Sequence, residues 1–194
     1  MFKTFIVSLL MTATASAAPY VIDSSHTEVG FSVKHLMIAN VKGRFDKFTG
    51  TFDFDPAKNQ LNKVNVEIET ASIDTNEADR DKHLRSNDFF GVDKYPKITF
   101  KSDKIEYSGD KPVKAIGTLK IRDKSKQVIL DLDYRGAITD AWGNNKIIFA
   151  AMTKINRKDF GITWNKALDK GGVTVGDEVN ISIEGQATPV APKK

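Results

Sequence analysis

The chain has no cysteine, which excludes disulfides, thiol catalysis and cysteine-based metal sites. It has only three histidines, His26, His35 and His83, so few side chains are available for a histidine-based metal site. The stability of the fold must therefore come from packing and hydrogen bonds.

The chain also lacks any long run of charge of one sign. Charged residues make up 28% of it and the net charge is only +4, with acids and bases alternating as in "KSDKIEYSGDK". Because no basic stripe follows a strand or helix, nucleic acid is not an expected partner. There is no nucleophile elbow, no phosphate-binding glycine loop and no HExxH motif. We therefore expect no enzymatic activity and no cofactor.

No apolar run reaches the roughly 20 residues that span a bilayer. The longest near the start, residues 5–11, follows Lys3 and leads to Ala15-Ser16-Ala17. This is the three-part pattern of a secretory signal peptide, cleaved after Ala17. The sequence thus predicts a signal peptide over residues 1–17, one domain over 18–187, a flexible tail over 188–194, and a location in the periplasm.

Most of the chain after residue 18 alternates between apolar and polar side chains. Segments such as "EVGFSVKH", "KVNVEIET" and "QVILDLDY" each have one apolar face, while "IIFAAM" is apolar on both sides and predicts a strand covered on both faces. Turn residues separate about seven to nine such strands, which indicates an antiparallel barrel or a sandwich. The alternation alone does not distinguish the two.

The segment "TNEADRDKHLRSNDFF", residues 75–90, interrupts this pattern and predicts one short helix. Thr75 or Asn76 is the expected N-cap, and Asp81 and Arg85 are one turn apart, so we expect them to pair on the exposed side.

Two interpretations of this helix differ in function. Asp79 and His83 are four residues apart and could hold a metal or act as an acid–base pair, although a metal would need a third ligand. Alternatively the helix has a polar outer face, and Leu84, Phe89 and Phe90 cover an apolar interior. We favour the second interpretation.

Six segments in order resemble the YceI-like family of secreted bacterial proteins. They are "DSSHTEVGFSVKHL", "GRFDKFTGTFDFD", "SIDTNEADRDKHLRSNDFF", "YPKITFKS", "RKDFGI" and "VGDEVNISI", and they cover nearly all of residues 20–184. One departure is the turn at Asp123 and Ser125, where the family tends to have Gly and Thr. The resemblance implies an all-β fold, a single extended antiparallel eight-stranded lipocalin-like β-barrel with one short helix. It also implies an apolar channel for a polyisoprenoid or similar long-chain amphiphilic lipid.

Inward-facing bulky residues are the candidates for the channel wall, although the same residues could simply pack against each other as a core. The candidate ligand-binding set is Phe31, Val33, Phe52, Phe54, Val66, Ile68, Phe89, Phe90, Phe100, Leu119, Ile121, Leu130, Leu132 and Phe149, with His35 at the end of one apolar face and Trp164 beside a turn. If the lipid has an anionic head group, Arg80, Lys82, Arg85 and Arg157 are the cations that could bind it.

The sequence therefore predicts an exported β-barrel that binds or sequesters an isoprenoid-like lipid without catalysis. One alternative is a hydrolase or isomerase acting on such lipids through His83 or His35. Another is a protein-interaction module without lipid. The oligomeric state stays open, and a homodimer is among the possibilities.

Overall fold

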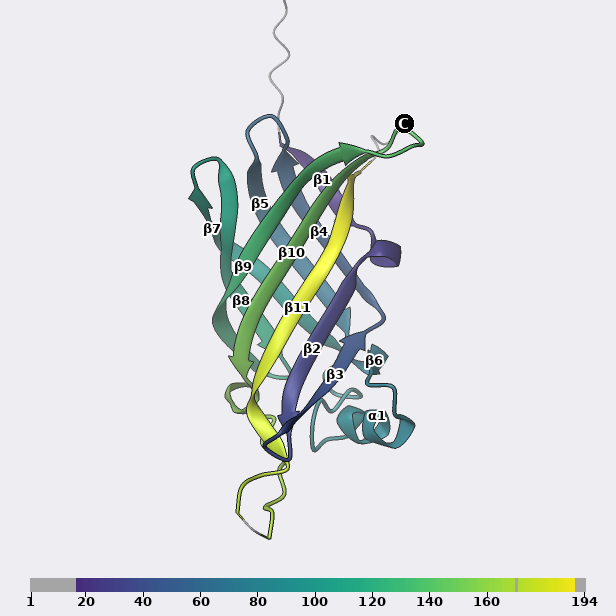
Figure 1. Cartoon of the computed structure of the whole chain (residues 1–194), viewed down its shortest axis with the longest axis vertical. Coiled ribbons are helices and arrows are strands. Elements are labelled where there is room, and N and C mark those ends of the chain that lie inside the picture. The colour runs from purple at the N-terminus through teal and green to yellow at the C-terminus, as the bar shows by residue number, and fades with distance from the viewer. Residues whose placement is uncertain (1–16, 170, 191–194) are drawn as a thin grey trace, which may run out of the picture.

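A computed structural model describes residues 17–169 and 171–190, so nearly all of the expected signal peptide lies outside the described residues. The chain forms one antiparallel sheet that curves into a barrel, with the single α-helix of the described residues at one end (Figure 1). The strands are β1 (Ala18–Ile22), β2 (Glu28–His35), β3 (Ala39–Phe45), β4 (Phe48–Asp55), β5 (Gln60–Glu69), β6 (Ile73–Asp74), β7 (Lys97–Ser108), β8 (Lys111–Ile121), β9 (Lys124–Thr139), β10 (Asn145–Asn156) and β11 (Val175–Pro189).

The sheet closes because β11 has partners on both edges. On one edge it pairs with β10, and on the other it pairs first with β2 and then, from Ala187 to Pro189, with β1. In the same way β1 pairs with β4 and β2 pairs with β3. If β1 with β2 and β3 with β4 are each counted as one interrupted strand, and the two-residue β6 at the edge of β3 is left out, the barrel has eight strands, which confirms the predicted fold. The pairing of Thr188 and Pro189 extends β11 two residues past the domain end expected at residue 187.

Alternation within the strands places apolar side chains inside the barrel. In β2, Phe31 and Val33 line the interior, while Lys34 between Val33 and His35 is exposed. The prediction that residues 147–152 are covered on both faces is wrong, because Met152 is 56% exposed. A barrel wall has one inner face, and on β10 that face takes Ile147 and Ala151.

The helix α1 (Ala78–Arg85) begins differently from the prediction. Glu77 is the N-cap, and its carboxylate accepts from the backbone N–H groups of Asp79 and Arg80. Thr75 is not available as a cap, because its backbone N–H donates to Asp81 at 2.9 Å and its hydroxyl donates to the same carboxylate oxygen.

The expected ion pair between Asp81 and Arg85 is also absent. Asp81 is buried and is satisfied by Thr75. The Arg85 guanidinium turns to the preceding segment and donates to the carbonyl oxygens of Ala71 and Ile73. Both groups thus connect the helix to the barrel, and neither forms a surface pair.

Arg122 comes directly before Asp123, one of the two positions where the chain departs from the family pattern, and its side-chain contacts hold this turn. Arg122 has φ 57°, a conformation that usually favours glycine. Its guanidinium donates to the Gly161 carbonyl at 2.8 Å and lies 5.3 Å from the ring centre of Tyr95. These contacts allow a residue other than glycine at this position.

Asp23 stabilises the join between β1 and β2. Its carboxylate accepts from Ser25 and from His26 Nδ1, and Lys146 Nζ lies 3.3 Å away. The hydrogen bonds from Ser25, together with those from His26 and Lys146, hold the pKa of Asp23 well below its usual range, against the opposing effect of burial.

We expect Asp23→Asn to lower the free energy of unfolding by about 1–2 kcal/mol at neutral pH and to flatten its dependence on pH. A carboxylate whose pKa is lowered on folding contributes stability that is fully present above its unfolded pKa of about 3.9, and this contribution is lost progressively as the pH falls from that value through the lower pKa of the folded state. Urea unfolding between pH 7 and pH 3 measures the effect. Asp131→Asn, at an exposed position on β9, is the control. Identical pH profiles for Asp23→Asn and wild type would contradict the assignment.

Candidate functional site

The interior of the barrel contains two cavities. The helix-side cavity has a volume of about 160 Å³ and is bordered by Leu84 of α1. The hairpin-side cavity, about 90 Å³, is bordered by Leu61 and Pro112, which lie next to the β4–β5 and β7–β8 turns. The two cavities share four wall residues, Val29, Val66, Leu130 and Ile183. The interior of the barrel, called the bore below, is therefore hollow on both sides of these four shared residues.

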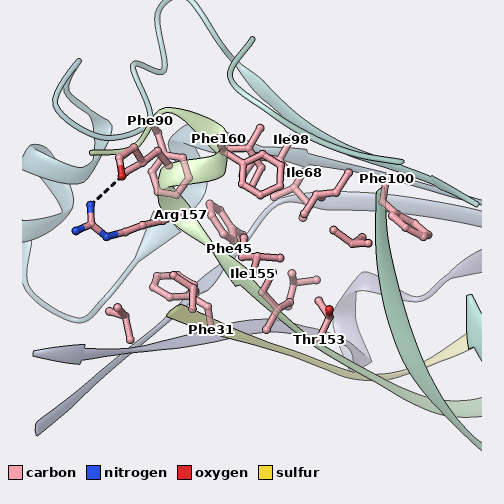
Figure 2. A pocket seen from close by; sticks show the side chains of 18 of the residues that line it. Phe31, Phe45, Ile68, Phe90, Ile98, Phe100, Thr153, Ile155, Arg157 and Phe160 are labelled. Carbon is pink, nitrogen blue, oxygen red and sulfur yellow. Dashed lines mark hydrogen bonds between the residues drawn. The ribbon is translucent and has the colours of Figure 1, made fainter. Parts of the chain in front are cut away.

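The wall of the helix-side cavity is almost entirely hydrocarbon. Apart from Gly30, Thr153 and Arg157, every lining residue is Val, Leu, Ile or Phe. Figure 2 shows these side chains directed toward a common space, with Arg157 at one end. An engineered cavity of about 150 Å³ lined by such residues stays dry and binds apolar molecules. The helix-side cavity has the chemistry to accept a hydrocarbon chain.

The hairpin-side cavity is also apolar, but it has polar groups at its margin. Thr27, Asp133 and Tyr134 are part of its lining. Tyr134 packs against Phe54 with ring centres 5.4 Å apart, and burial raises the pKa of its hydroxyl. The hydroxyl therefore stays protonated and able to donate a hydrogen bond at neutral pH.

Most of the residues predicted for the wall line one of the two cavities. The segment 75–90 contributes Leu84, Phe89 and Phe90 to the interior, as the second interpretation of the helix expected. The helix-side cavity takes Phe31, Val33, Val66, Ile68, Phe89, Phe90, Phe100, Leu119, Ile121, Leu130 and Arg157, and the hairpin-side cavity takes Phe52, Phe54, Leu132 and Phe149.

Three predicted residues do not line either cavity. His35 is the last residue of β2, beyond Val33, and pairs with Val175 at the barrel end. Arg80 donates from its guanidinium to the hydroxyl and the carbonyl of Thr75. Trp164 packs behind the wall, with its ring centre 5.2 Å from that of Phe89.

Arg157 lines the helix-side cavity, but it is not the free cation that the sequence suggested. It is 4% exposed at the start of the short helical turn η3 (Arg157–Phe160). Its guanidinium donates to the carbonyl oxygens of Gly176, Ile162 and Trp164, each at 2.8 Å. Burial lowers the pKa of Arg157, and nearby Asp177 opposes this shift. These carbonyl contacts make Arg157 a structural residue that joins η3 to β11.

His83 does not meet the requirements of the metal interpretation. Its Nε2 lies 3.0 Å from a carboxylate oxygen of Asp88, and its ring packs edge-on against Phe89 and Trp164. Among the residues that the structure describes, no group of three or more His, Cys, Asp or Glu side chains could hold a metal ion. His83 supports the cavity wall from behind.

Sequence reasoning left out part of the wall. β11 contributes Val179, Ile181 and Ile183, and their alternation was a sufficient signal. Some other omissions, such as Phe45, Phe160 and Ile162, had no comparable signal because they stand at a strand end, in η3 or just after it, where the period-two pattern stops. In the described part of the chain, no helix is long and apolar enough to cross a membrane.

Comparisons with known proteins agree with this architecture. The YceI-like domain model matches residues 20–187. The YceI protein of Salmonella agona is 41% identical over 184 residues, which are 94% of each chain. A crystal structure of the Campylobacter jejuni YceI protein is 38% identical, with a TM-score of 0.70 over 88% of this chain and 97% of that one. A polyisoprenoid-binding domain from Saccharophagus degradans, 14% identical, shares the fold with a TM-score of 0.63 over 90% of this chain and all of its own. The chain belongs to the YceI-like domain family.

Proposed function

We propose that this protein binds a long-chain isoprenoid or a similar amphiphilic lipid, with the tail in the barrel, and carries or sequesters it in the periplasm. The observation that carries the proposal is the pair of hydrocarbon-lined cavities that share Val29, Val66, Leu130 and Ile183. The family supports it, as does the polyisoprenoid-binding description of the Saccharophagus domain with the same fold. The signal-peptide pattern of residues 1–17 supports export, and β1 begins at Ala18, directly after the expected cleavage site.

Burial of the tail supplies enough free energy for this function. Each buried methylene contributes roughly 0.8 kcal/mol, so a tail of about twelve methylenes gains about 10 kcal/mol before the costs of association. The helix-side cavity alone has room for a short apolar group. A long tail must therefore occupy both cavities, and the side chains of the shared wall must turn aside to let it pass.

The polar head belongs outside the bore. Arg157, the one cation of the helix-side wall, already donates to backbone carbonyls. An anionic head placed beside it would have to compete with these bonds. We infer that the protein recognises its lipid mainly by the length and shape of the tail. We also infer that it binds without catalysis, as the family and the fold suggest.

Mass spectrometry of the natively produced protein tests the proposal. The full-length chain is expressed in a Gram-negative host, recovered from the periplasmic fraction, and extracted with organic solvent. We expect a mature N-terminus at Ala18 and a long-chain isoprenoid or related lipid near one molecule per chain.

Two outcomes would contradict different parts of the proposal. A folded protein that yields no lipid, and that takes up no added polyprenol, contradicts the binding function. A protein found only in the cytoplasm with residues 1–17 attached contradicts export, and leaves the result on lipid binding intact.

A further inference from the structure

The turn between β2 and β3 exposes three consecutive apolar side chains. Leu36 is 44% exposed, Met37 is 58% exposed and Ile38 is 84% exposed. Single exposed apolar residues are common on protein surfaces, but a contiguous group usually marks a contact surface. This turn lies at the same end of the barrel as α1 (Figure 1).

The backbone of this turn does not favour these residues. Leu36 has φ 49° and Met37 has φ 68°, in the left-handed region where glycine, asparagine and aspartate are the usual residues. A hairpin built for stability alone would place such a residue at one of these positions. The combination of backbone strain and exposed apolar surface therefore points to a contact outside the chain.

A second loop supports the turn from the side. The backbone N–H of Leu36 donates to the Thr174 carbonyl at 2.9 Å. The side chains of Met37 and Leu168 both lie close to Gly172, so the two loops are in contact. We refer to residues 36–38 together with Leu168 as the tip. In Figure 1 the tip is at the lower end of the molecule, below β2 and β11.

Lysines surround the tip. Lys34 and Lys42 are exposed on the outer face of the β2–β3 hairpin, and Lys166 is exposed in the supporting loop. None of the three forms an ion pair with any residue from 17–169 or 171–190, whereas the neighbouring Lys158 pairs with Asp177. One acid, Asp169, is exposed in the same loop. An exposed apolar tip surrounded by lysines is suited to binding an anionic bilayer, because the apolar side chains can enter the interface while the lysines contact the lipid phosphates.

The tip is next to the helix-side cavity. Val33 and Val175 line this cavity, and both are adjacent to His35, which pairs with Val175 just before the turn. We propose that the tip docks the protein on an anionic phospholipid surface, with the helix-side cavity directed at the bilayer. This adds a docking site to the proposed lipid carrier, and it rests on surface geometry that is independent of what fills the bore.

The opposite end of the barrel is the competing candidate. Trp142 is 85% exposed and Ile138 is 56% exposed there. The turn between β9 and β10, which contains Trp142, has an ordinary backbone conformation. Gly143 takes the positive φ, and the Asp140 carboxylate accepts from the backbone N–H groups of Trp142 and Asn144. The cation closest in sequence, Lys146, is paired with Asp23. The Trp142 turn therefore lacks the backbone strain at non-glycine residues, and its nearest lysine is already paired.

Flotation of the mature protein with phosphatidylcholine vesicles, with and without phosphatidylglycerol, tests the proposal. We expect wild type to bind the phosphatidylglycerol vesicles and to release them as salt screens the lysines. Ile38→Asp should weaken binding about tenfold or more, because it places a charge in the interface. Ile129→Asp, at a 48% exposed position on the barrel wall, is the matched control and should bind like wild type.

A second measurement locates the contact without loss of binding. The chain has no cysteine, so Ile38→Cys carries an environment-sensitive dye at one defined position. Its emission should shift to the blue on phosphatidylglycerol vesicles, while Ile138→Cys at the opposite end should show no shift.

Three results would overturn the docking proposal: no binding of wild type at low salt, wild-type binding by Ile38→Asp, or loss of binding in Trp142→Ser alone. Binding to a purified periplasmic protein partner through the tip, without binding to vesicles, would also overturn it. The lipid extracted from Ile38→Asp should equal that from wild type, so a failure of docking is distinguishable from a failure of the carrier function.

Discussion

Val66→Trp is expected to reduce the amount of lipid that co-purifies with the protein by about tenfold or more. Val66 is one of the four residues that line both cavities, and it lies in β5 opposite Phe100 of β7. An indole at this position fills the space that a long tail must cross. Overpacking of this kind costs about 1–3 kcal/mol of stability, which a barrel of this size should tolerate. Lipid per folded chain, measured by mass spectrometry after solvent extraction, gives the result.

The control places the same side chain on the other face of the wall. Ile129→Trp adds an indole at an exposed position on β9 and should keep wild-type lipid content. Short apolar probes provide a second check, because a blocked shared wall still leaves part of the helix-side cavity open. If Val66→Trp folds and retains the full amount of a long-chain lipid, the tail does not run through the bore.

Arg157→Met is expected to lower the free energy of unfolding by roughly 3–5 kcal/mol. The substitution keeps an apolar stem of similar length but removes the donors that satisfy the carbonyl oxygens of Gly176, Ile162 and Trp164. With Arg157 only 4% exposed, water cannot easily replace these bonds. Chemical denaturation of the lipid-free protein measures the loss.

Two further variants separate this effect from a general effect of charge. Arg135→Met removes a surface guanidinium that pairs with Asp133 and Glu184, and should cost less than about 1 kcal/mol. Arg157→Lys keeps the positive charge but lacks the planar fork of donors, so it should restore only part of the stability. Full restoration by lysine would mean that the charge, and not the set of hydrogen bonds, is what the site requires.

The barrel could be predicted from the sequence because its signal is local. A side chain such as Phe31 or Val33 faces inward because of its position in the alternation, whichever strand pairs with it. Most of the residues predicted for the wall from this alternation do line one of the two cavities. Whether they enclose a space or pack into a solid core depends on the curvature of the whole sheet, so the presence of two cavities required coordinates.

Polar residues were harder to place, because their partners are distant in sequence or not side chains at all. Asp81 was expected on the surface but is buried against Thr75, and Arg157 was expected to meet a ligand but is bound to backbone carbonyls. Every residue has a backbone carbonyl, so the sequence does not indicate which carbonyl an arginine will bind. The residue type alone therefore cannot separate a structural arginine from a binding one.

The pairing of β11 with both β1 and β2 determines when the molecule can form. The strands that complete the circle come from opposite ends of the chain, with Val21 beside Thr188 and Phe31 beside Ile181. Contacts of this range form slowly, since a long stretch of chain must be ordered before they can contribute. β1 and β2 can pair with β4 and β3 early, but each gains its second neighbour only when β11 has been synthesised, so the barrel stays open until the chain is nearly complete. A chain that stays open until it is nearly complete is also the form that the proposed export would need, because a translocation channel admits an unfolded chain.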